Sequence, residues 1–187
     1  MALCIWEHES CLDSFLEGSA TGRAWREATD EYCELRATPF RSHGTYRGLE
    51  PLAALEPTRP DHGPVALWTF ANIPLRSLTY FWSGIRGATA SLLTSPALIA
   101  GTAGPEHIYR GAMTFTLWKQ IDEALGFAYR TPPHREIVSG VREHNRLIDS
   151  MFIRMSPYRA SGTWPSTSRF APAFQRFADS IPSHVPV

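Results

Sequence analysis

Apolar and polar residues follow two different periods along this chain, and the changes of period predict a series of strands and helices. Alternation and runs of β-forming residues predict strands over residues 2–6, 32–38, 63–71, 97–101 continuing at 108–118, and 151–155. Apolar residues at a spacing of three and four predict helices over residues 10–16, 24–30, 74–85, 119–129 and 134–143. The chain is therefore expected to combine strands and helices in an α+β fold.

The pattern contains an internal repeat. One closing motif, which reads Pro, aromatic residue, Arg, two variable residues, Gly, Thr and aromatic residue, occupies residues 39–46 and occurs again at 157–164. Trp6 opens the stretch that leads to the first motif, and Trp118 opens the stretch that leads to the second. A match of this detail implies two copies of one supersecondary unit, so a residue present in only one copy becomes a candidate for function. His134 is such a residue, because the first copy has Gly22 near that position.

The second copy has a complete set of predicted elements. Strand, helix, strand or hairpin, helix and strand follow one another, which is the order of a ferredoxin-like α+β unit. Two such units that pack their sheets together form an α+β barrel. We therefore expect a single α+β barrel domain over residues 1–187, made of a partial repeat (1–48), a linker (49–62), a complete ferredoxin-like repeat (63–164) and a C-terminal tail (165–187).

Further expectations concern the first repeat, the connection between the two halves and the C-terminal tail. The first repeat begins at its third or fourth element, so it is incomplete at its N-terminus. Residues 39–60 are rich in Gly and Pro, which break regular structure and here connect the two halves. In the tail, Phe170, Phe174 and Phe177 recur at helical spacing, which favours a short helix docked on the body of the protein.

Composition and charge narrow the function classes. Lys plus Arg equals Asp plus Glu at 18 each, so the chain lacks the basic field that nucleic-acid binding requires, and no nucleic-acid partner is expected. Cys4, Cys11 and Cys33 have no CxxC spacing, which favours reduced thiols over a disulfide scaffold or a zinc site. Polar residues and Pro96 interrupt the most apolar stretch, and the start of the chain does not resemble a secretory signal. A soluble cytoplasmic protein is expected, with peripheral membrane contact left open.

Several short motifs carry a resemblance to a known family. They are Met-Thr-Phe-Thr-Leu-Trp at residues 113–118, Phe-Ala-Tyr-Arg at 127–130, the strand at 63–73, Phe81-Trp82, residues 104–106, His134, residues 152–155 and 162–164. Over about residues 32–164 the chain resembles the spheroidene monooxygenase family of carotenoid biosynthesis. The resemblance implies a haem-binding protein of the dimeric α+β barrel class, with haem b as cofactor. It also implies oxidation of an apolar, carotenoid-like substrate with dioxygen and an external electron donor, commonly a ferredoxin.

Five residues are candidates for the haem site. A haem iron needs an axial donor, and a neutral imidazole on a helix is a common one, so His134 is the predicted metal ligand. Arg110 and His107 flank the strand that leads to Trp118 and are the predicted catalytic residues; Arg110 is also expected to pair with a haem propionate or to donate to dioxygen. Trp118 and Phe127 are expected in the wall of the cofactor site, although aromatic residues also serve as ordinary core. A surface or helix-capping histidine at 134 and solvated charges at 107 and 110 are the open alternatives.

Other catalytic patterns are missing from the sequence. It contains no HExxH zinc motif, no GxSxG nucleophile elbow and no glycine-rich phosphate loop. Reducing power is therefore expected from a partner protein. Two further function classes stay open: a haem-binding dehydratase or isomerase of secondary metabolism, and a non-catalytic ferredoxin-like dimerisation module. Assembly into a homo-oligomer is also left open, because a partial first repeat exposes sheet edges.

Overall fold

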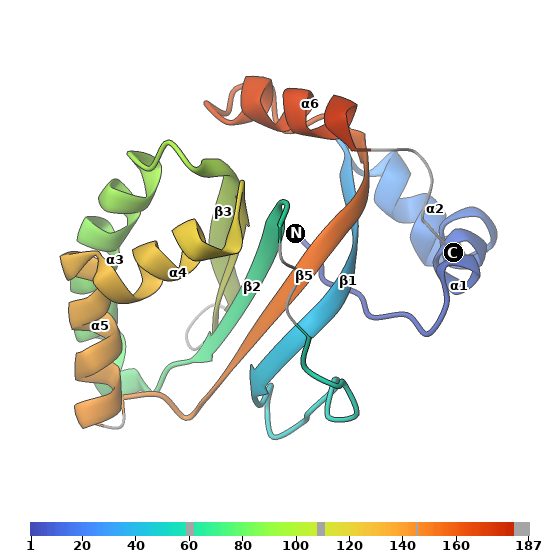
Figure 1. Cartoon of the computed structure of the whole chain (residues 1–187). Coiled ribbons are helices and arrows are strands. Elements are labelled where there is room, and N and C mark those ends of the chain that lie inside the picture. The colour runs from blue at the N-terminus through green and yellow to red at the C-terminus, as the bar shows by residue number, and fades with distance from the viewer. Residues whose placement is uncertain (59–61, 108–110, 145, 182–187) are drawn as a thin grey trace.

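The fold is α+β, with one antiparallel sheet and helices around it (Figure 1). A computed structural model describes residues 1–58, 62–107, 111–144 and 146–181. The strands are β1 (Cys33–Gly44), β2 (Val65–Asn72), β3 (Leu98–His107), β4 (Gly111–Trp118) and β5 (Asp149–Gly162), in the sheet order β1-β5-β2-β4-β3. The helices are α1 (Glu9–Gly18), α2 (Ala20–Glu27), α3 (Leu78–Leu93) after a 3-10 turn (Leu75–Ser77), α4 (Ile121–Arg130), α5 (Pro132–Glu143) and α6 (Ala171–Ser180).

The second half has the element order that the sequence predicts. From β2 to β5 the chain forms strand, helix, strand, strand, two consecutive helices and strand. The break between α4 and α5 falls at Thr131, because the two prolines that follow lack the N–H groups that a helix interior needs and are tolerated only in a first turn. Among the described residues, no helix combines the length and the apolarity that crossing a membrane requires.

Three predicted elements differ from the structure. Residues 2–6 form no strand and pair with none of the five strands of the sheet, although Leu3 packs against the core. The helix predicted at 24–30 begins earlier, at Ala20, because the Ser19 side chain accepts a hydrogen bond from the Gly22 N–H at 2.8 Å and caps it. The predicted break at residue 39 is also wrong: β1 continues through Pro39 to Gly44. An edge strand with a bulge tolerates a residue that cannot donate a hydrogen bond.

Strands β1 and β5 pair in a symmetric register. Thr38 lies opposite Ser156, and each strand has one bulge at an equal distance from that pair, with Phe40 and Tyr158 as the extra residues. The order of paired and extra residues is therefore the same along β1 as along β5. This symmetry relates the first closing motif to the second across a local two-fold axis.

The glycines of the two closing motifs also have the same geometry. Gly44 and Gly162 have φ angles of 84° and 79°, a region that glycine adopts without steric cost. Each glycine ends its strand, and the N–H of the following threonine donates to the carbonyl of the residue before the glycine's paired residue, which is Ser150 in one case and Tyr32 in the other, at 2.9 Å in both. The matching residues of the two motifs thus make matching backbone contacts.

The sheet has two faces with different covers. Paired residues of adjacent strands lie on the same face, so Trp118, which contacts Phe127 of α4, identifies the side covered by α3, α4 and α5. Figure 1 shows these three helices beside the sheet, α6 across one end, and α1 with α2 next to β1. Helix α6 packs on the opposite face: Phe115, which pairs with Trp68 there, stacks on Trp164, and the ring of Trp164 lies 5.3 Å from that of the fully buried Phe174. The tail helix therefore docks on the body, as its phenylalanine spacing predicts.

Candidate functional site

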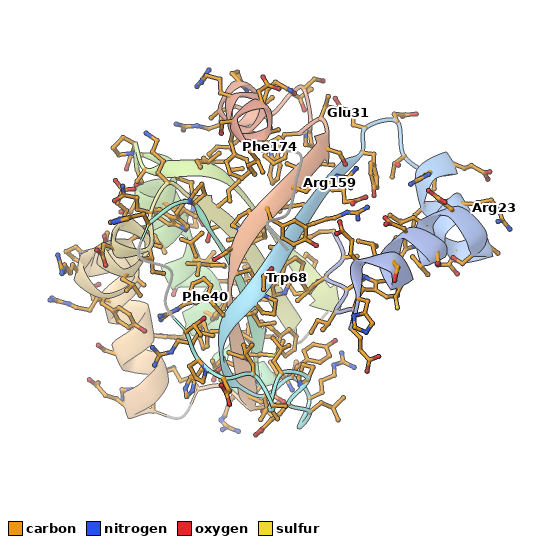
Figure 2. All side chains as sticks on the ribbon, turned by 45° about the vertical axis from the view of Figure 1, so that its right-hand side comes forward. Arg23, Glu31, Phe40, Trp68, Arg159 and Phe174 are labelled. Atoms are coloured by element: carbon orange, nitrogen blue, oxygen red, sulfur yellow. The ribbon has the colours of Figure 1, made fainter. Side chains whose placement is uncertain are left out.

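We call the side of the sheet that faces α3, α4 and α5 the helix-covered face. The register of β2, β4 and β5 gives its central residues, which alternate with those of the opposite face: Val65, Leu67, Thr69, Thr114, Thr116, Trp118, Phe152 and Arg154. Figure 2 shows the side chains of the sheet, with Trp68 on the opposite face labelled. The helix-covered face is thus built from aliphatic, hydroxyl, aromatic and guanidinium groups.

Burial changes along the helix-covered face. Val65 and Trp118, at one end, are each 1% exposed. Leu67 and Thr116 in the next row are only half-buried, and Phe152, farther along on β5, is 44% exposed. The helix layer therefore closes one end of this face tightly and leaves its middle partly accessible, although helices lie on that side.

Trp118 and Phe127, the two predicted wall residues, lie together at the closed end. Trp118 is the last residue of β4, and its ring centroid lies 5.5 Å from that of Phe127 on α4, with the planes tilted by 38°. The register places Val65 and Leu98 beside Trp118 on the neighbouring strands. The Trp118 indole Nε1 is buried and has no hydrogen-bond partner within the described residues. The pair is compatible with the cofactor wall that the sequence predicts and equally with ordinary core.

Of the two predicted catalytic residues, only the backbone of His107 belongs to the described part of the chain. His107 ends β3 opposite Gly111, the first residue of β4, and its side chain is outside the described part of the chain. Arg110 lies outside the described residues altogether. An eight-residue strand separates its two ends by roughly 24 Å, so the backbone does not bring His107, paired with Gly111, next to Trp118.

His134 lies in the first turn of α5, within the helix layer of the candidate site. This helix contacts α3, where the Tyr80 hydroxyl donates to the Glu136 carbonyl at 3.3 Å. The side chain of His134 itself is outside the described residues. Its helix belongs to the layer that covers Trp118, so the backbone arrangement is compatible with a ligand between that layer and the sheet.

The first half has a closed helix contact near the matching position. A Cβ added to Gly22 of α2 would collide with the backbone carbonyl of Phe15 and would lie 2.9 Å from the Cα of Leu16 on α1. No side chain therefore fits there without moving a helix. The contrast between Gly22 and His134, found in the sequence, thus corresponds to a steric requirement on the Gly22 side.

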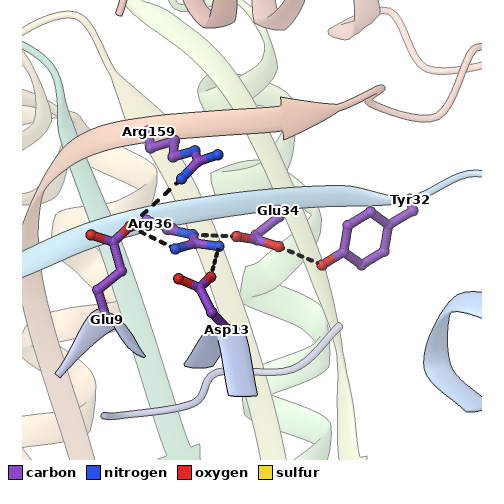
Figure 3. Close-up of polar contacts among 6 residues, drawn as sticks. All are labelled: Glu9, Asp13, Tyr32, Glu34, Arg36 and Arg159. Carbon is purple, nitrogen blue, oxygen red and sulfur yellow. Dashed lines mark hydrogen bonds and ion pairs between the residues drawn. The ribbon is translucent and has the colours of Figure 1, made fainter. Parts of the chain in front are cut away.

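A charged cluster joins α1 to β1 (Figure 3). The sequence analysis did not predict it. The Arg36 side chain, 8% exposed, donates to Glu9 and Asp13 of α1, both at 2.6 Å, and to Glu34 on its own strand. Glu9 and Asp13 stand four residues apart on one side of α1, which is the sequence signal that was available. We call Glu9, Asp13, Glu34 and Arg36 the arginine cluster. It anchors α1 on the outer strand, away from the candidate site.

The arginine cluster shifts several ionisation equilibria. The hydrogen bond that Asp13 accepts from Arg36 lowers the pKa of Asp13 below the usual carboxyl value. Burial acts to lower the pKa of Arg36, but the bonds to the three carboxylates outweigh it and raise that pKa. Burial and the 2.7 Å hydrogen bond that Tyr32 donates to Glu34 raise the pKa of the Tyr32 hydroxyl to about 12. Asp13 and Arg36 therefore stay charged, and the Tyr32 hydroxyl stays neutral, at neutral pH.

One small pocket lies beside the N-terminus of α4. It has a volume of about 200 Å³ and is lined by His62, Gly63, Gln120, Ile121 and Asp122. Pockets for drug-sized ligands span about 300–1,000 Å³, so this one does not accommodate a haem. In the described part of the chain, no group of three or more His, Cys, Asp or Glu side chains is placed to hold a metal ion.

Comparison with known proteins relates the chain to two named enzymes. Spheroidene monooxygenase from Rubrivivax gelatinosus is 26% identical over 160 residues, which cover 86% of this chain and 60% of that protein. Spheroidene monooxygenase from Rhodobacter capsulatus is 22% identical over 143 residues, which cover 76% of this chain and 59% of that protein. No protein-family model matches the chain. The two likenesses support a distant, family-level relationship to monooxygenases, and the matched part spans about three fifths of each relative.

Two solved structures have a low similarity to this chain. A protein from Fusobacterium nucleatum subsp. nucleatum, provisionally named a monooxygenase, has a TM-score of 0.49 at 7% identity, over 77% of this chain and 63% of that one. A conserved protein of unknown function from Bacteroides thetaiotaomicron has a TM-score of 0.42 at 14% identity, over 51% of this chain and 98% of that one. Both scores are too low to carry an argument about function.

Proposed function

We propose that this chain acts as a haem-dependent monooxygenase that oxidises an apolar, carotenoid-like substrate with dioxygen. Electrons come from an external donor such as a ferredoxin. The observation that carries the proposal is the likeness to two spheroidene monooxygenases over 86% and 76% of the chain. The partly accessible helix-covered face, beneath the helix layer that contains His134, supports it independently.

The residues present fit a haem in their chemistry. Trp118 and Phe127 provide an aromatic wall, and the half-buried Leu67 and Thr116 provide a floor that mixes aliphatic and hydroxyl groups. His134 on α5 provides an imidazole nitrogen, which is a common axial donor. When bound, haem supplies the activation of dioxygen. The chain itself holds the cofactor, orients the apolar substrate through its aromatic side chains and excludes water.

The proposed site also includes the two predicted catalytic residues. His107 and Arg110 are proposed to act at the substrate end of the site, and a guanidinium at Arg110 suits a carboxylate or an oxygen acceptor. Because His107 is paired with Gly111, at the far end of β4 from Trp118, His107 and Trp118 are proposed to contact different parts of one bound ligand assembly.

We propose that the chain is one barrel-type domain built from two ferredoxin-like repeats, the first of them partial. The symmetric register about Thr38 and Ser156 supports this, because strands at matching ends of two repeats would pair in that way. A second copy of the chain is proposed to complete the barrel. The protein is proposed to work in the cytoplasm, with peripheral membrane contact as the route by which an apolar substrate enters.

Haem titration tests the cofactor proposal. Purified wild type is expected to develop a Soret band at one haem per chain, and His134→Ala is expected to lose or shift it. His144→Ala is the matched control, because His144 caps the other end of the same helix, where its exposed ring lies 3.2 Å from the Gly140 carbonyl. A wild type without a Soret band contradicts the proposal, as does a His134→Ala spectrum identical to wild type.

A turnover assay tests the reaction. The haem-loaded protein, a reduced ferredoxin and an acyclic carotenoid under ¹⁸O₂ are expected to yield a product that contains the label. Product formation without a donor or dioxygen would indicate the dehydratase or isomerase alternative instead. Haem binding without any conversion, across several apolar substrates, would contradict the monooxygenase assignment.

A further inference from the structure

The paired strands β1 and β5 carry two pairs of arginines. In the first arginine pair Arg36 lies opposite Arg159, and in the second arginine pair Arg41 lies opposite Arg154. Each pair adjoins one of the two bulges, so the local two-fold axis exchanges the pairs: Arg36 corresponds to Arg154, and Arg41 to Arg159. Burial follows the same symmetry, because Arg36 and Arg154 are the less exposed members of their pairs.

Carboxylates of the chain itself occupy the first arginine pair. Glu9 of α1 accepts a hydrogen bond from Arg36 at 2.6 Å and also lies 3.8 Å from Arg159, so one carboxylate bridges both guanidinium groups (Figure 3). Asp13 and Glu34 bind Arg36 as well. Like charges directly opposite each other on neighbouring strands destabilise a sheet, and these carboxylates offset that repulsion.

The second arginine pair has apolar residues at the positions that correspond to those carboxylates. Helices α1 and α4 begin 112 residues apart, which is also the separation of the Trp6–Phe15 pair from the Trp118–Phe127 pair, and β1 matches β5 at a separation of 118. At these separations the counterparts of Glu9, Asp13 and Glu34 are Ile121, Leu125 and Phe152. The second half thus keeps both arginines and replaces all three carboxylates.

The surroundings of the second arginine pair are accessible. Arg41 is exposed and Arg154 is half-buried on the helix-covered face. Phe152, two residues before Arg154 on the same face of β5, is 44% exposed. Two guanidinium groups therefore adjoin an apolar surface that is open to a ligand. Guanidinium groups match the geometry of a carboxylate, so the combination suits a molecule that has both a carboxylate and an apolar body.

We propose that Arg41 and Arg154 bind the carboxylate of a ligand whose apolar body lies on Phe152. The ligand carboxylate takes the bridging position that Glu9 has in the first arginine pair. Two sources share this chemistry: an apolar acid with a polyene or alkyl chain, and a porphyrin with free carboxylates. The inference goes beyond the proposed function, because an acid bound in this way does not require a haem.

Binding of matched acids and neutral analogues to wild type tests the inference. Retinoic acid and retinol share one polyene, and zinc protoporphyrin and its dimethyl ester share one macrocycle. Quenching of tryptophan fluorescence measures all four affinities. At least one acid is expected to bind about 10-fold more tightly than its neutral analogue, since it gains hydrogen bonds between charged groups. Equal affinities within both matched sets, or no binding of either acid, overturn the inference.

Variants locate the preference for the acid. Arg41→Met and Arg154→Met are each expected to lose it, whereas Arg159→Met, at the exposed position of the first arginine pair, is expected to keep it. Phe152→Glu restores the carboxylate that the first half has at Glu34 and is expected to lose the preference with both arginines in place. Phe152→Gln is its neutral control and is expected to keep it. Retention of the preference in Arg41→Met and Arg154→Met overturns the inference.

The two sets of probes separate this inference from the proposed function. A preference for the free porphyrin over its ester assigns the second arginine pair to a haem carboxylate. A preference for retinoic acid alone assigns the pair to an acidic substrate. If wild type binds neither porphyrin but prefers retinoic acid to retinol, the haem proposal fails and the inference stands.

Discussion

The helix pair α1–α2 beside β1 and the helix pair α4–α5 beside β4 follow one plan with different interiors. Both begin with a tryptophan that packs on a phenylalanine nine residues later, at centroid distances of 5.2 and 5.5 Å. The first pair is closed by Gly22 against α1 and held to the sheet by the buried guanidinium of Arg36. The second pair has His134 and covers a partly accessible sheet face. One plan thus serves once as an anchor and once as the proposed cover of a ligand site.

The largest expected effect concerns the two glycines that end β1 and β5. Gly44→Ala and Gly162→Ala should each lower the free energy of unfolding by about 3 kcal/mol, because each places a Cβ against a backbone carbonyl at positive φ. Urea unfolding measures both. Equal losses would confirm that the two strand ends are equivalent.

Gly48→Ala is the matched control for that pair. Gly48 also has positive φ, at 75°, but no atom lies within 4 Å of an added Cβ. Only the backbone term remains, so a loss of about 1 kcal/mol is expected. If Gly48→Ala were as harmful as Gly162→Ala, the carbonyl contact would not be the cause.

The second effect breaks the anchor of the first half. Arg36→Met should lower the free energy of unfolding by about 2 kcal/mol, because Glu34, 15% exposed, is left as a largely buried carboxylate without its partner. Arg159→Met is the control: Arg159 is 52% exposed and lies 3.8 Å from Glu9, so a change below about 0.5 kcal/mol is expected. Similar losses in the two variants would show that burial does not decide the strength of these pairs.

More of the fold than of the candidate site could be predicted from the sequence. The helical and alternating patterns from residue 63 onward predict the strand and helix order, since each apolar stripe there faces one core. The break predicted at Pro39 was wrong, because the local rules for proline do not show that β1 is an edge strand, in which a proline is tolerated. The arginine cluster was missed because Arg36 and Asp13 lie 23 residues apart, and only the fold brings them together. The contrast between Gly22 and His134 could be found from the sequence, because finding it requires only that the two copies of the repeat be compared.

Acid should loosen the first half before the second. The folded-state pKa of Asp13 lies below its usual value, so the stability that this group contributes is complete above the ordinary carboxyl pKa of about 4 and is lost as the pH falls through the lowered value. Amide chemical shifts of α1, followed from pH 6 downward, measure the release. In Arg36→Met this acid-dependent step should disappear; its persistence would point to other carboxylates.

The smallest expected effect concerns the N-terminal caps of α2 and α5, which are the second helices of the two pairs. Ser19→Ala should cost about 1 kcal/mol, because the Ser19 side chain caps α2. Thr131→Ala should change stability by less than about 0.5 kcal/mol, because Thr131 precedes α5 without a side-chain capping bond. Thermal unfolding of both variants measures the difference, and equal shifts would contradict the assigned caps.

Chemical rescue of His134→Gly most directly tests the central claim that the second helix pair holds a haem through His134. The variant gives the second half the residue that the first half has at Gly22. It is expected to lose the wild-type Soret spectrum and to regain it when free imidazole is added, while His144→Gly keeps the spectrum throughout. A His134→Gly protein that keeps the wild-type spectrum, or that binds haem but does not respond to imidazole, would contradict the claim.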